Sequence, residues 1–377
     1  MSASFSSVDY DLRQQRLAQA IKIAQLEGMA LNAGPSLTYL TGLHFHLSER
    51  PVLGLFSAGN PPVIVLPELE TGKISNLAYQ TSSFAYGEDP ETWQTIMKEG
   101  IQAAGFSGRR IGIEPRVLRV LELDLLNSTG IDFTLVSGEA ALAHLRMQKD
   151  EYEQARMQKA VDIAQNALDA ILPEIKPGIT ERELAAKLVV ALLNNGSDPQ
   201  LPFSPIVASG PNSANPHAFP TDRQLIKGDL LIIDWGANEG GYFSDLTRTF
   251  AIGDPQQEMV EIAQIVLEAN QAAHNIARPG VSAQEVDQAA RAVIEAAGYG
   301  DYFTHRTGHG LGMEGHEAPY IRAGNPILLT PGMTFTIEPG IYLSGKGGVR
   351  IEDDVVITEE GLYSFSDLPR ELKILGS

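Results

Sequence analysis

Apolar and polar residues are arranged in two different patterns over the first 140 residues of the chain. Some segments repeat apolar residues with the period of an amphipathic helix, and others are short runs of strand-forming residues bounded by turn signals. The expected helices are residues 8–28, 91–104 and 117–126, and the expected strands are residues 29–31, 52–56, 63–66, 110–113 and 133–136. This alternation predicts an α/β domain over residues 1–140.

A second domain is expected over residues 146–377, beginning with a long charged helix from about Asp150 to Leu172. Two segments of this region are similar to each other. Each is a Pro-Gly turn followed by a helix with a capping box, in which a Ser or Thr and a Glu three residues later bond each other's backbone N–H. The segments are Lys176–Leu184, with Thr180 and Glu183, and Arg278–Val286, with Ser282 and Glu285.

The similarity continues into two acids. Gly228 precedes Asp234 by six residues, Gly332 precedes Glu338 by six residues, and a glycine follows each acid two residues later. The matched segments lie about 102 to 104 residues apart and occur in the same order. Two structurally related halves are therefore predicted. Such halves pack about a pseudo-twofold axis, which would bring the acids of both halves together.

An apolar run with strand character, residues 231–233, ends on Asp234 and leads through a glycine-rich turn to Asp245. A buried strand has little reason to end on a carboxylate unless a positive group meets it there. A hairpin through this turn would place Asp234 and Asp245 at one point. Two carboxylates held close repel each other, so one pKa would rise unless a cation neutralises them.

Three later residues complete a candidate metal site. Glu338 follows an expected strand at residues 333–337, and Glu352 lies within an expected strand at residues 349–356. His309 lies between two glycines, which would let the backbone approach a ligand closely. Singly, each residue has an ordinary structural explanation, as a turn acid, a strand edge or a loop. Together, four carboxylates and one imidazole suit two divalent ions about 3.5 to 4 Å apart, and oxygen-rich ligands favour Mn²⁺ before Zn²⁺ or Co²⁺.

The composition narrows the classes of function. The chain has no cysteine, which excludes disulfides, thiolate zinc sites and a cysteine nucleophile. Its 28 Lys and Arg against 47 Asp and Glu give a net charge of -19, so nucleic acid and anionic membranes are poor partners. The polar N-terminus is unlike a signal peptide, and no run of about 18 apolar residues occurs, so a cytoplasmic location is expected.

Six short motifs follow one another in the second domain. They are Asp234-x-Gly236, Asp245 eleven residues after Asp234, Gly308–Gly312, His316–Pro319, Ile337–Gly340 and Arg350–Asp353. This set resembles the motifs of the pita-bread metallopeptidases, the family of methionine aminopeptidase, aminopeptidase P and prolidase. The segments Ser209–His217 and His305–Thr307 are similar to the proline-specific branch.

The resemblance implies an α+β chain of two domains. The first, over residues 1–140, is similar to the creatinase/prolidase-like α/β domain that aminopeptidase P and prolidase carry. The second, over residues 146–377, is similar to a pita-bread domain with its pseudo-twofold repeat. The resemblance also implies a homodimer.

It further implies a role for each matching residue. The five metal ligands of the family match Asp234, Asp245, His309, Glu338 and Glu352. Asp245 and Glu352 are expected to bridge the two ions. Glu338 also matches the acid that takes a proton from the water shared by the metals.

Three residues match groups that contact the substrate. His316 and His217 match two histidines that bind substrate and stabilise the tetrahedral intermediate. Arg350 resembles a residue near the C-terminal side of the substrate; it could pair with a free carboxylate or orient Glu352. Gly315 stands where many relatives carry a bulkier residue, so the pocket wall beside His316 is expected to differ.

The implied function is that of a dinuclear metallopeptidase acting on peptides with proline in second position. The leading hypothesis is aminopeptidase P, which removes the residue before proline from peptides of three or more residues. The alternative is prolidase, which is restricted to Xaa-Pro dipeptides. A metal-free creatinase-like hydrolase and a non-catalytic peptide-binding module fit less well, because all five ligands and both histidines are present.

Overall fold

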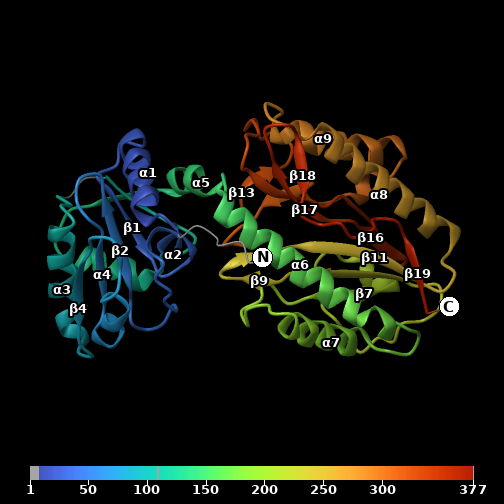
Figure 1. Cartoon of the computed structure of the whole chain (residues 1–377), viewed down its shortest axis with the longest axis horizontal. Helices are drawn as coiled ribbons and strands as arrows, with labels where there is room; N and C mark the ends of the chain where they lie inside the picture. The colour runs from blue at the N-terminus through green and yellow to red at the C-terminus, as the bar shows by residue number, and fades with distance from the viewer. Residues whose placement is uncertain (1–7, 108–109, 377) are drawn as a thin grey trace, which may run out of the picture. The chain divides into compact units, whose positions relative to one another are not determined.

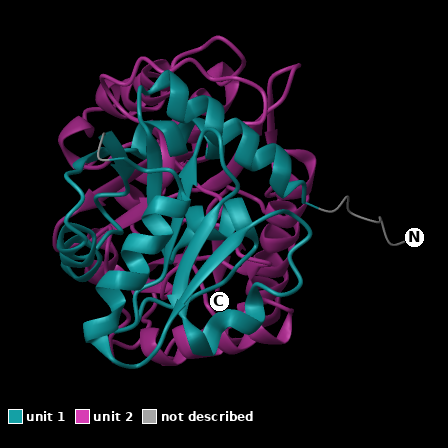
Figure 2. Cartoon of the chain, turned by 90° about the vertical axis from the view of Figure 1, so that its left-hand side faces the viewer, with its two compact units in different colours: residues 1–146 teal, residues 147–377 magenta. Residues whose placement is uncertain are grey.

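In the computed structural model, which describes residues 8–107 and 110–376, the chain forms two compact units, Met1–Arg146 and Met147–Ser377 (Figure 2). Helix α5 (Glu139–Arg146) belongs to the first unit, whereas the sequence analysis ended the first domain at residue 140. Leu145 is buried, and Arg146 Nη1 donates to Ser36 Oγ at 3.0 Å. These contacts join the helix to residues far away in the sequence, which a local pattern cannot reveal.

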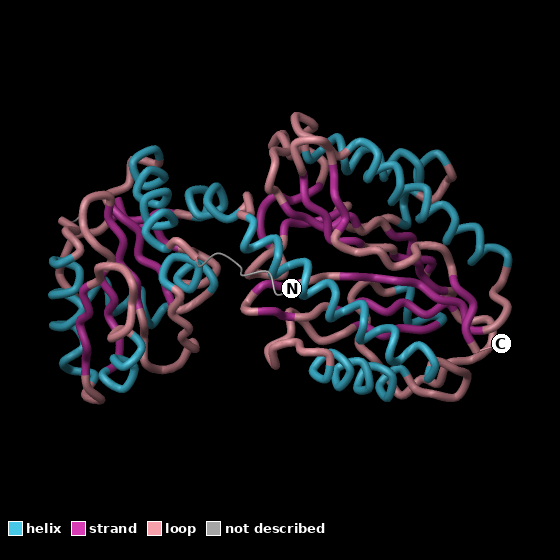
Figure 3. The backbone as a smooth tube through the Cα atoms, in the orientation of Figure 1, coloured by secondary structure: helices cyan, strands magenta, loops and turns pink. Residues whose placement is uncertain are grey.

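The first unit is a six-stranded mixed sheet with helices (Figure 3). Besides α5, its elements are α1 (Tyr10–Ile23), β1 (Gly28–Asn32), α2 (Pro35–Thr41), β2 (Leu53–Ser57), β3 (Val63–Pro67), η1 (Glu68–Lys73), β4 (Ser82–Tyr86), α3 (Pro90–Ala103), β5 (Arg110–Ile113), α4 (Val120–Ser128) and β6 (Thr134–Ser137). The strands lie in the order β4-β3-β2-β1-β5-β6; β1 is antiparallel to β2 and parallel to β5.

Several elements of the first unit differ from those predicted from the sequence. Helix α1 ends at Ile23, and Gly28 opens β1 instead of ending the helix. A Cβ on Gly28 would lie 2.6 Å from Phe56 O, so the close pairing of β1 with β2 requires glycine there. Helix α2 and strand β4 were not predicted, because α2 has only seven residues and β4 begins with two serines.

The second unit begins with two helices, a four-stranded sheet and a small ribbon. Its first elements are α6 (Glu151–Ile171), η2 (Leu172–Glu174), α7 (Glu181–Asn194), β7 (Ile206–Ser209), η3 (Gly210–Ala214), β8 (Leu230–Trp235), β9 (Asn238–Glu239), β10 (Tyr242–Phe243) and β11 (Leu246–Ile252). The sheet has the order β19-β11-β8-β7, in which β19 (Lys373–Leu375) comes from a segment much later in the sequence, and β9 pairs with β10.

Two more helices, a five-stranded sheet and a second ribbon follow. These elements are α8 (Gln257–Ile276), α9 (Ala283–Ala296), η4 (Gly300–Tyr302), β12 (Gly308–Gly310), β13 (Glu317–Ile321), β14 (Thr334–Ile337), β15 (Gly340–Leu343), β16 (Gly347–Arg350), β17 (Asp353–Ile357), β18 (Leu362–Ser364) and β19 (Lys373–Leu375). The sheet has the order β13-β12-β14-β17-β18, and β15 pairs with β16. No helix in the described residues is long and apolar enough to cross a membrane.

Matching backbone hydrogen bonds reveal the internal repeat of the second unit. Four glycines donate to backbone carbonyls at equivalent places: Gly178 to Leu225 and Gly228 to Ile252 in the first half, Gly280 to Leu329 and Gly332 to Ile357 in the second. Their φ angles lie between 85° and 95°, in the left-handed region that glycine adopts without strain. Both expected capping boxes are formed, at Thr180 and at Ser282. The two halves are therefore built alike.

Each half packs a helix pair against its own sheet. In the first half, Leu168 and Leu188 of the helices share a core with Trp235; in the second, Val266 and Ile294 share a core with Phe335. Figure 1 shows α7 on one side of this unit and α8 and α9 on the other, with the strands between them. The strand ends that carry the candidate residues are therefore held by close-packed interiors.

Candidate metal centre and active site

Asp234 and Asp245 lie at the two ends of the turn between β8 and β11. The strands are antiparallel with Asp234 opposite Thr247, so both acids come to the same end of the strand pair. The chain passes between them through Gly236, where a Cβ would lie 2.0 Å from Ser244 O. Glycine is needed at this crossing, and the hairpin that the sequence predicted is confirmed.

Glu338 directly follows β14, and Glu352 directly precedes β17. The expected continuous strand over residues 349–356 is wrong, because β16 ends at Arg350 and β17 begins at Asp353 in a different sheet. Between them, Glu352 exchanges backbone hydrogen bonds with Thr247, at 3.1 and 3.4 Å. The two halves of the repeat meet at this pair of residues, which places the acids of both halves at one centre.

His309 is the middle residue of β12. A Cβ on Gly308 would lie 1.8 Å from Thr336 O, and one on Gly310 would lie 2.2 Å from Ala318 O. The two glycines thus allow neighbouring backbone to approach β12 closely. The expectation that they let the backbone approach a ligand is therefore wrong. The imidazole is positioned by its strand, and its side chain is 3% exposed.

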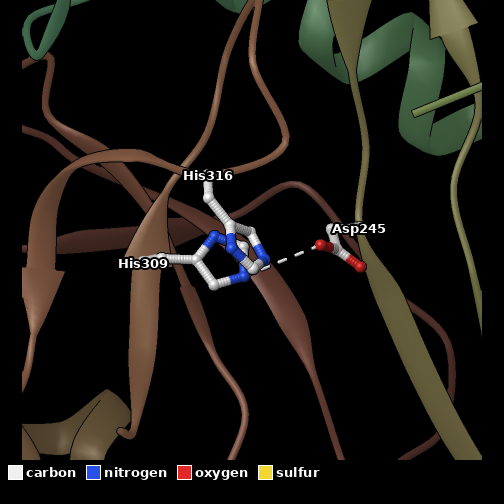
Figure 4. Close-up of side chains that lie close together, drawn as sticks. All are labelled: Asp245, His309 and His316. Atoms are coloured by element: carbon white, nitrogen blue, oxygen red, sulfur yellow. Dashed lines mark ion pairs between the residues drawn. The ribbon is translucent and has the colours of Figure 1, made fainter. Parts of the chain in front are cut away.

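The five predicted metal ligands come together. Each of three groups has ligand atoms within 4.8 Å of one another: Asp234, Asp245 and Glu352; His309, Glu338 and Glu352; Asp245, His309 and His316. His309 Nε2 lies 3.7 Å from Asp245 Oδ2 and 3.4 Å from Glu338 Oε1. Figure 4 shows His309 and His316 side by side and facing Asp245. The groups overlap, as two ions with shared ligands would require.

Burial and mutual repulsion act on the carboxyl groups of this cluster. Burial, followed by the charge of Glu352, raises the pKa of Asp245, and burial, followed by the charge of Glu338, raises the pKa of Glu352. Burial raises the pKa of Glu338 to about 7. Asp234 Oδ1 is buried without a hydrogen-bond partner among the residues that the structure describes. Crowded carboxylates with an unpartnered oxygen fit divalent cations, which would neutralise their repulsion.

Arg350 is held by groups of the protein itself. Its side chain is 4% exposed; Nη2 donates to Asp234 Oδ2 at 2.6 Å, Nη1 to the Tyr342 hydroxyl at 2.9 Å and Nε to Thr247 Oγ1 at 3.1 Å. Thr247 Oγ1 in turn donates to Glu352 Oε2 at 2.7 Å. Of the two roles that the sequence left open, these contacts favour the orientation of metal-site acids over the binding of a substrate carboxylate.

Asn270, on α8, joins the two backbone segments that lead into the later acids, Glu338 and Glu352. Its side chain is fully buried, and Nδ2 donates to Ile337 O at 3.1 Å and to Ile351 O at 3.3 Å. These carbonyls immediately precede Glu338 and Glu352. The sequence analysis missed Asn270, because a single asparagine on a long helix carries no local signal of such a contact.

Asn270→Leu is expected to weaken divalent metal binding by roughly 10- to 100-fold, because groups behind metal ligands typically contribute that much. Leucine has a similar size but cannot donate to either carbonyl. Isothermal titration of the metal-free protein with Mn²⁺ measures the effect, and Gln271→Ala on the exposed face of the same helix is the control. An unchanged affinity in a folded Asn270→Leu protein would contradict the assigned role.

A hydrogen bond from a neighbouring arginine determines the tautomer of His316. Arg306 Nη2 lies 3.1 Å from His316 Nδ1. Because a guanidinium can only donate, Nδ1 accepts and the proton of the neutral ring is on Nε2. Burial, followed by the charge of Arg306, lowers the pKa of His316 to about 4, so the ring is neutral at pH 7. His316 therefore offers an N–H donor beside the carboxylate cluster.

A chain of hydrogen bonds connects Arg350 to the loop before β12. The Tyr342 hydroxyl accepts from Arg350 and donates to His305 Nε2 at 2.8 Å, and His305 Nδ1 donates to Arg306 O at 2.7 Å. Burial lowers the pKa of His305 to about 4, which keeps the ring neutral as this chain requires. The loop that carries Arg306 is thereby held to the arginine that holds Asp234.

All the candidate residues line one cavity of about 930 Å³. They are Asp234, Asp245, His309, Glu338, Glu352, His217, His316 and Arg350. His217 reaches the cavity from the loop after η3 and, within the described part of the chain, is outside the three groups of possible metal ligands. Near Gly315 a Cβ would meet nothing within 4 Å, so the wall beside His316 is open. The cavity is large enough for a small peptide.

Both units match known protein families. A family model described as metallopeptidase family M24 matches residues 155–359, and one described as the creatinase/prolidase N-terminal domain matches residues 13–148. The expected two-domain α+β architecture and the resemblance to the proline-specific branch are thereby confirmed.

Three similar proteins are named for peptidase activity. The probable dipeptidase PepE of Mycobacterium tuberculosis (strain ATCC 25618 / H37Rv) is 37% identical over 383 residues, 99% of each chain. The Xaa-Pro dipeptidase of Lactobacillus delbrueckii subsp. lactis is 35% identical over 343 residues, 90% of this chain and 92% of the relative. The structure of a recombinant prolidase from Thermococcus sibiricus is 34% identical and covers 98% of this chain and 100% of its own, with a TM-score of 0.91.

Proposed function

The chain belongs to metallopeptidase family M24, and we propose that it is a metal-dependent Xaa-Pro dipeptidase, which splits a dipeptide between its first residue and proline. The convergence of four carboxylates and His309 on one cavity carries this proposal, because it supplies the ligands for two divalent cations at a site that a short peptide can enter.

On the sequence alone, aminopeptidase P is the leading hypothesis and prolidase the alternative. The names of the relatives support the dipeptidase better, since PepE and the Lactobacillus protein are both called dipeptidases. The metal-ligand motifs serve both activities, so they do not distinguish the two. The distinction depends on what surrounds the residue after the scissile bond.

Two divalent cations held by the five ligands would polarise the scissile carbonyl and lower the pKa of a water molecule. Asp245, Glu352 and His309 each belong to two of the ligand groups, and of these only the two carboxylates have a pair of oxygens that could serve both ions. The oxygen-rich ligands favour Mn²⁺, with Co²⁺ or Zn²⁺ as alternatives.

The surrounding residues would handle protons and charge. Glu338 lines the cavity beside His309 Nε2 and is placed to accept a proton from the attacking water and return it to the leaving nitrogen. His316 Nε2–H is placed to donate to the carbonyl oxygen as negative charge develops on it. His217 lies in the same cavity wall and would contact the substrate from another side.

Ala-Pro is expected to be hydrolysed in the presence of Mn²⁺, and at least about tenfold faster than Ala-Pro-Ala or Ala-Ala. Dialysis against a chelator should abolish the activity, and Mn²⁺ should restore it. Release of alanine, followed by chromatography, measures both effects. Equal or faster cleavage of Ala-Pro-Ala would identify an aminopeptidase instead, and the absence of metal-dependent cleavage of any of the three would refute the proposal.

A further inference from the structure

A dipeptidase must recognise a feature that longer peptides lack. In Xaa-Pro, that feature is a free carboxylate on the proline, directly after the scissile bond. A positively charged side chain in the cavity could bind this carboxylate through charge-assisted hydrogen bonds. The same side chain would bind the neutral amide of a longer peptide much more weakly. This inference rests on the proposed function and concerns how the same site selects its substrates.

In the described part of the chain, the lining of the cavity contains two arginines, Arg306 and Arg350, and no lysine. Arg350 is 3% exposed, and its guanidinium donates to Asp234, Tyr342 and Thr247. A substrate carboxylate would have to break these bonds and leave Asp234 without its partner, which is costly for buried charges. Arg350 is therefore a poor candidate for this task.

Arg306, unlike Arg350, is accessible and has donors that are not used by other side chains of the described chain. It is partly exposed, and among the described residues its guanidinium makes one hydrogen bond, to His316, and no ion pair with a carboxylate. Its Cζ lies 4.6 Å from the centre of the Tyr320 ring, which supports the flat face of the group. Within the part of the chain that the structure describes, four of its five N–H groups have no hydrogen-bond partner, so the planar edge can bind a carboxylate through two parallel hydrogen bonds.

The position of Arg306 matches the size of a proline residue. Consecutive residues are about 3.8 Å apart along a chain, so the carboxylate of a dipeptide is a few ångströms from the scissile carbonyl. His316, proposed to contact that carbonyl oxygen, is in direct contact with Arg306 at 3.1 Å. One substrate can therefore reach both residues at once, its carbonyl at His316 and its carboxylate at Arg306.

The loop of Arg306 is also held in place before substrate arrives. Its carbonyl accepts from His305 Nδ1, and His305 is connected through Tyr342 to Arg350. The backbone of Arg306 is held by His305, and its guanidinium is held against the Tyr320 ring. Arg306 therefore loses little conformational freedom when it binds a ligand. We propose that Arg306 binds the C-terminal carboxylate of the dipeptide and is the specificity-determining residue that favours dipeptides over longer peptides.

The test compares Ala-Pro with Ala-Pro-amide, which lacks only the negative charge. The native protein should prefer Ala-Pro by about 10- to 100-fold in kcat/KM, the usual contribution of hydrogen bonds to a charged group. In Arg306→Gln this preference should fall to near unity, mainly through a higher KM for Ala-Pro. Arg306→Lys, which keeps the charge but not the planar fork, should restore part of it.

Arg322→Gln is the matched control, because Arg322 is an exposed arginine whose side chain, among the residues described, donates only to its neighbour Ala323. Metal content and the unfolding midpoint confirm that each variant is folded. If Arg306→Gln slowed both substrates by the same factor, Arg306 would act only through His316 and the inference would be wrong. If the native protein failed to cleave Ala-Pro with Mn²⁺, the proposed function would be refuted instead. That outcome is seen with the unsubstituted protein and requires no variant.

Discussion

Replacing Glu338 by glutamine is expected to lower kcat for Ala-Pro by about 10³-fold, within the range that a positioned proton acceptor contributes. The amide has nearly the same shape but cannot accept a proton from the attacking water. Glu338 lines the cavity, and its Oε1 lies 3.4 Å from His309 Nε2. Its backbone N–H donates to Thr307 O at 2.7 Å, so the substitution leaves the local chain anchored.

Steady-state kinetics and elemental analysis of the same samples measure this prediction. Glu338 is also a proposed metal ligand, so the metal content separates loss of the ion from loss of the proton acceptor. Glu360→Gln, at an exposed glutamate outside the cavity, is the control and should behave as the native protein does. A Glu338→Gln protein that retained the native kcat would show that another group accepts the proton.

His316→Ala is expected to lower kcat by roughly 10²- to 10³-fold, the usual effect of removing one donor to a developing oxyanion. The metal content should stay the same, because Arg306 makes Nδ1 an acceptor and leaves the proton on Nε2. A protonated Nε2 can donate to a carbonyl oxygen but cannot ligate a cation. KM should change much less than kcat, since the interaction forms mainly in the transition state.

The alternative for His316 is that it binds metal with Asp245 and His309, since ligand atoms of all three lie within 4.8 Å of one another. In that case His316→Ala would lose bound metal in proportion to its loss of activity. Inductively coupled plasma spectrometry on the purified variant distinguishes the two roles. His46→Ala, at an exposed histidine of the first unit, controls for general effects of removing an imidazole.

Much of the fold could be predicted because its signals are local. Strand β5 has the predicted bounds, Arg110–Ile113. The capping boxes of α7 and α9 were recognised from a Ser or Thr and a Glu three residues later. The unpredicted elements lack such signals. Helix α2 is too short to show a helical period, and β4 has two exposed serines at its start and pairs at the sheet edge.

The sequence by itself determined which acids and which histidines form the candidate site. Asp234 and Glu338 could be matched because the same glycine spacing precedes each, and the glycines at 228 and 332 adopt a positive φ that glycine takes without strain. His309 could be recognised because it lies between two glycines. Glycine is needed at these two positions because neighbouring backbone approaches them closely.

Only the tertiary structure decided how these residues are held and what surrounds them. The hydrogen bond of Arg350 to Asp234, the meeting of Thr247 with Glu352, and the two hydrogen bonds of Asn270 join positions roughly 70 to 120 residues apart. Likewise, Arg306 is a candidate for carboxylate binding because the fold places it on Tyr320 and leaves it without a carboxylate partner in the described chain. Such contacts depend on the packing of the two halves against each other, and packing depends on the shapes of many residues at once instead of on any short pattern.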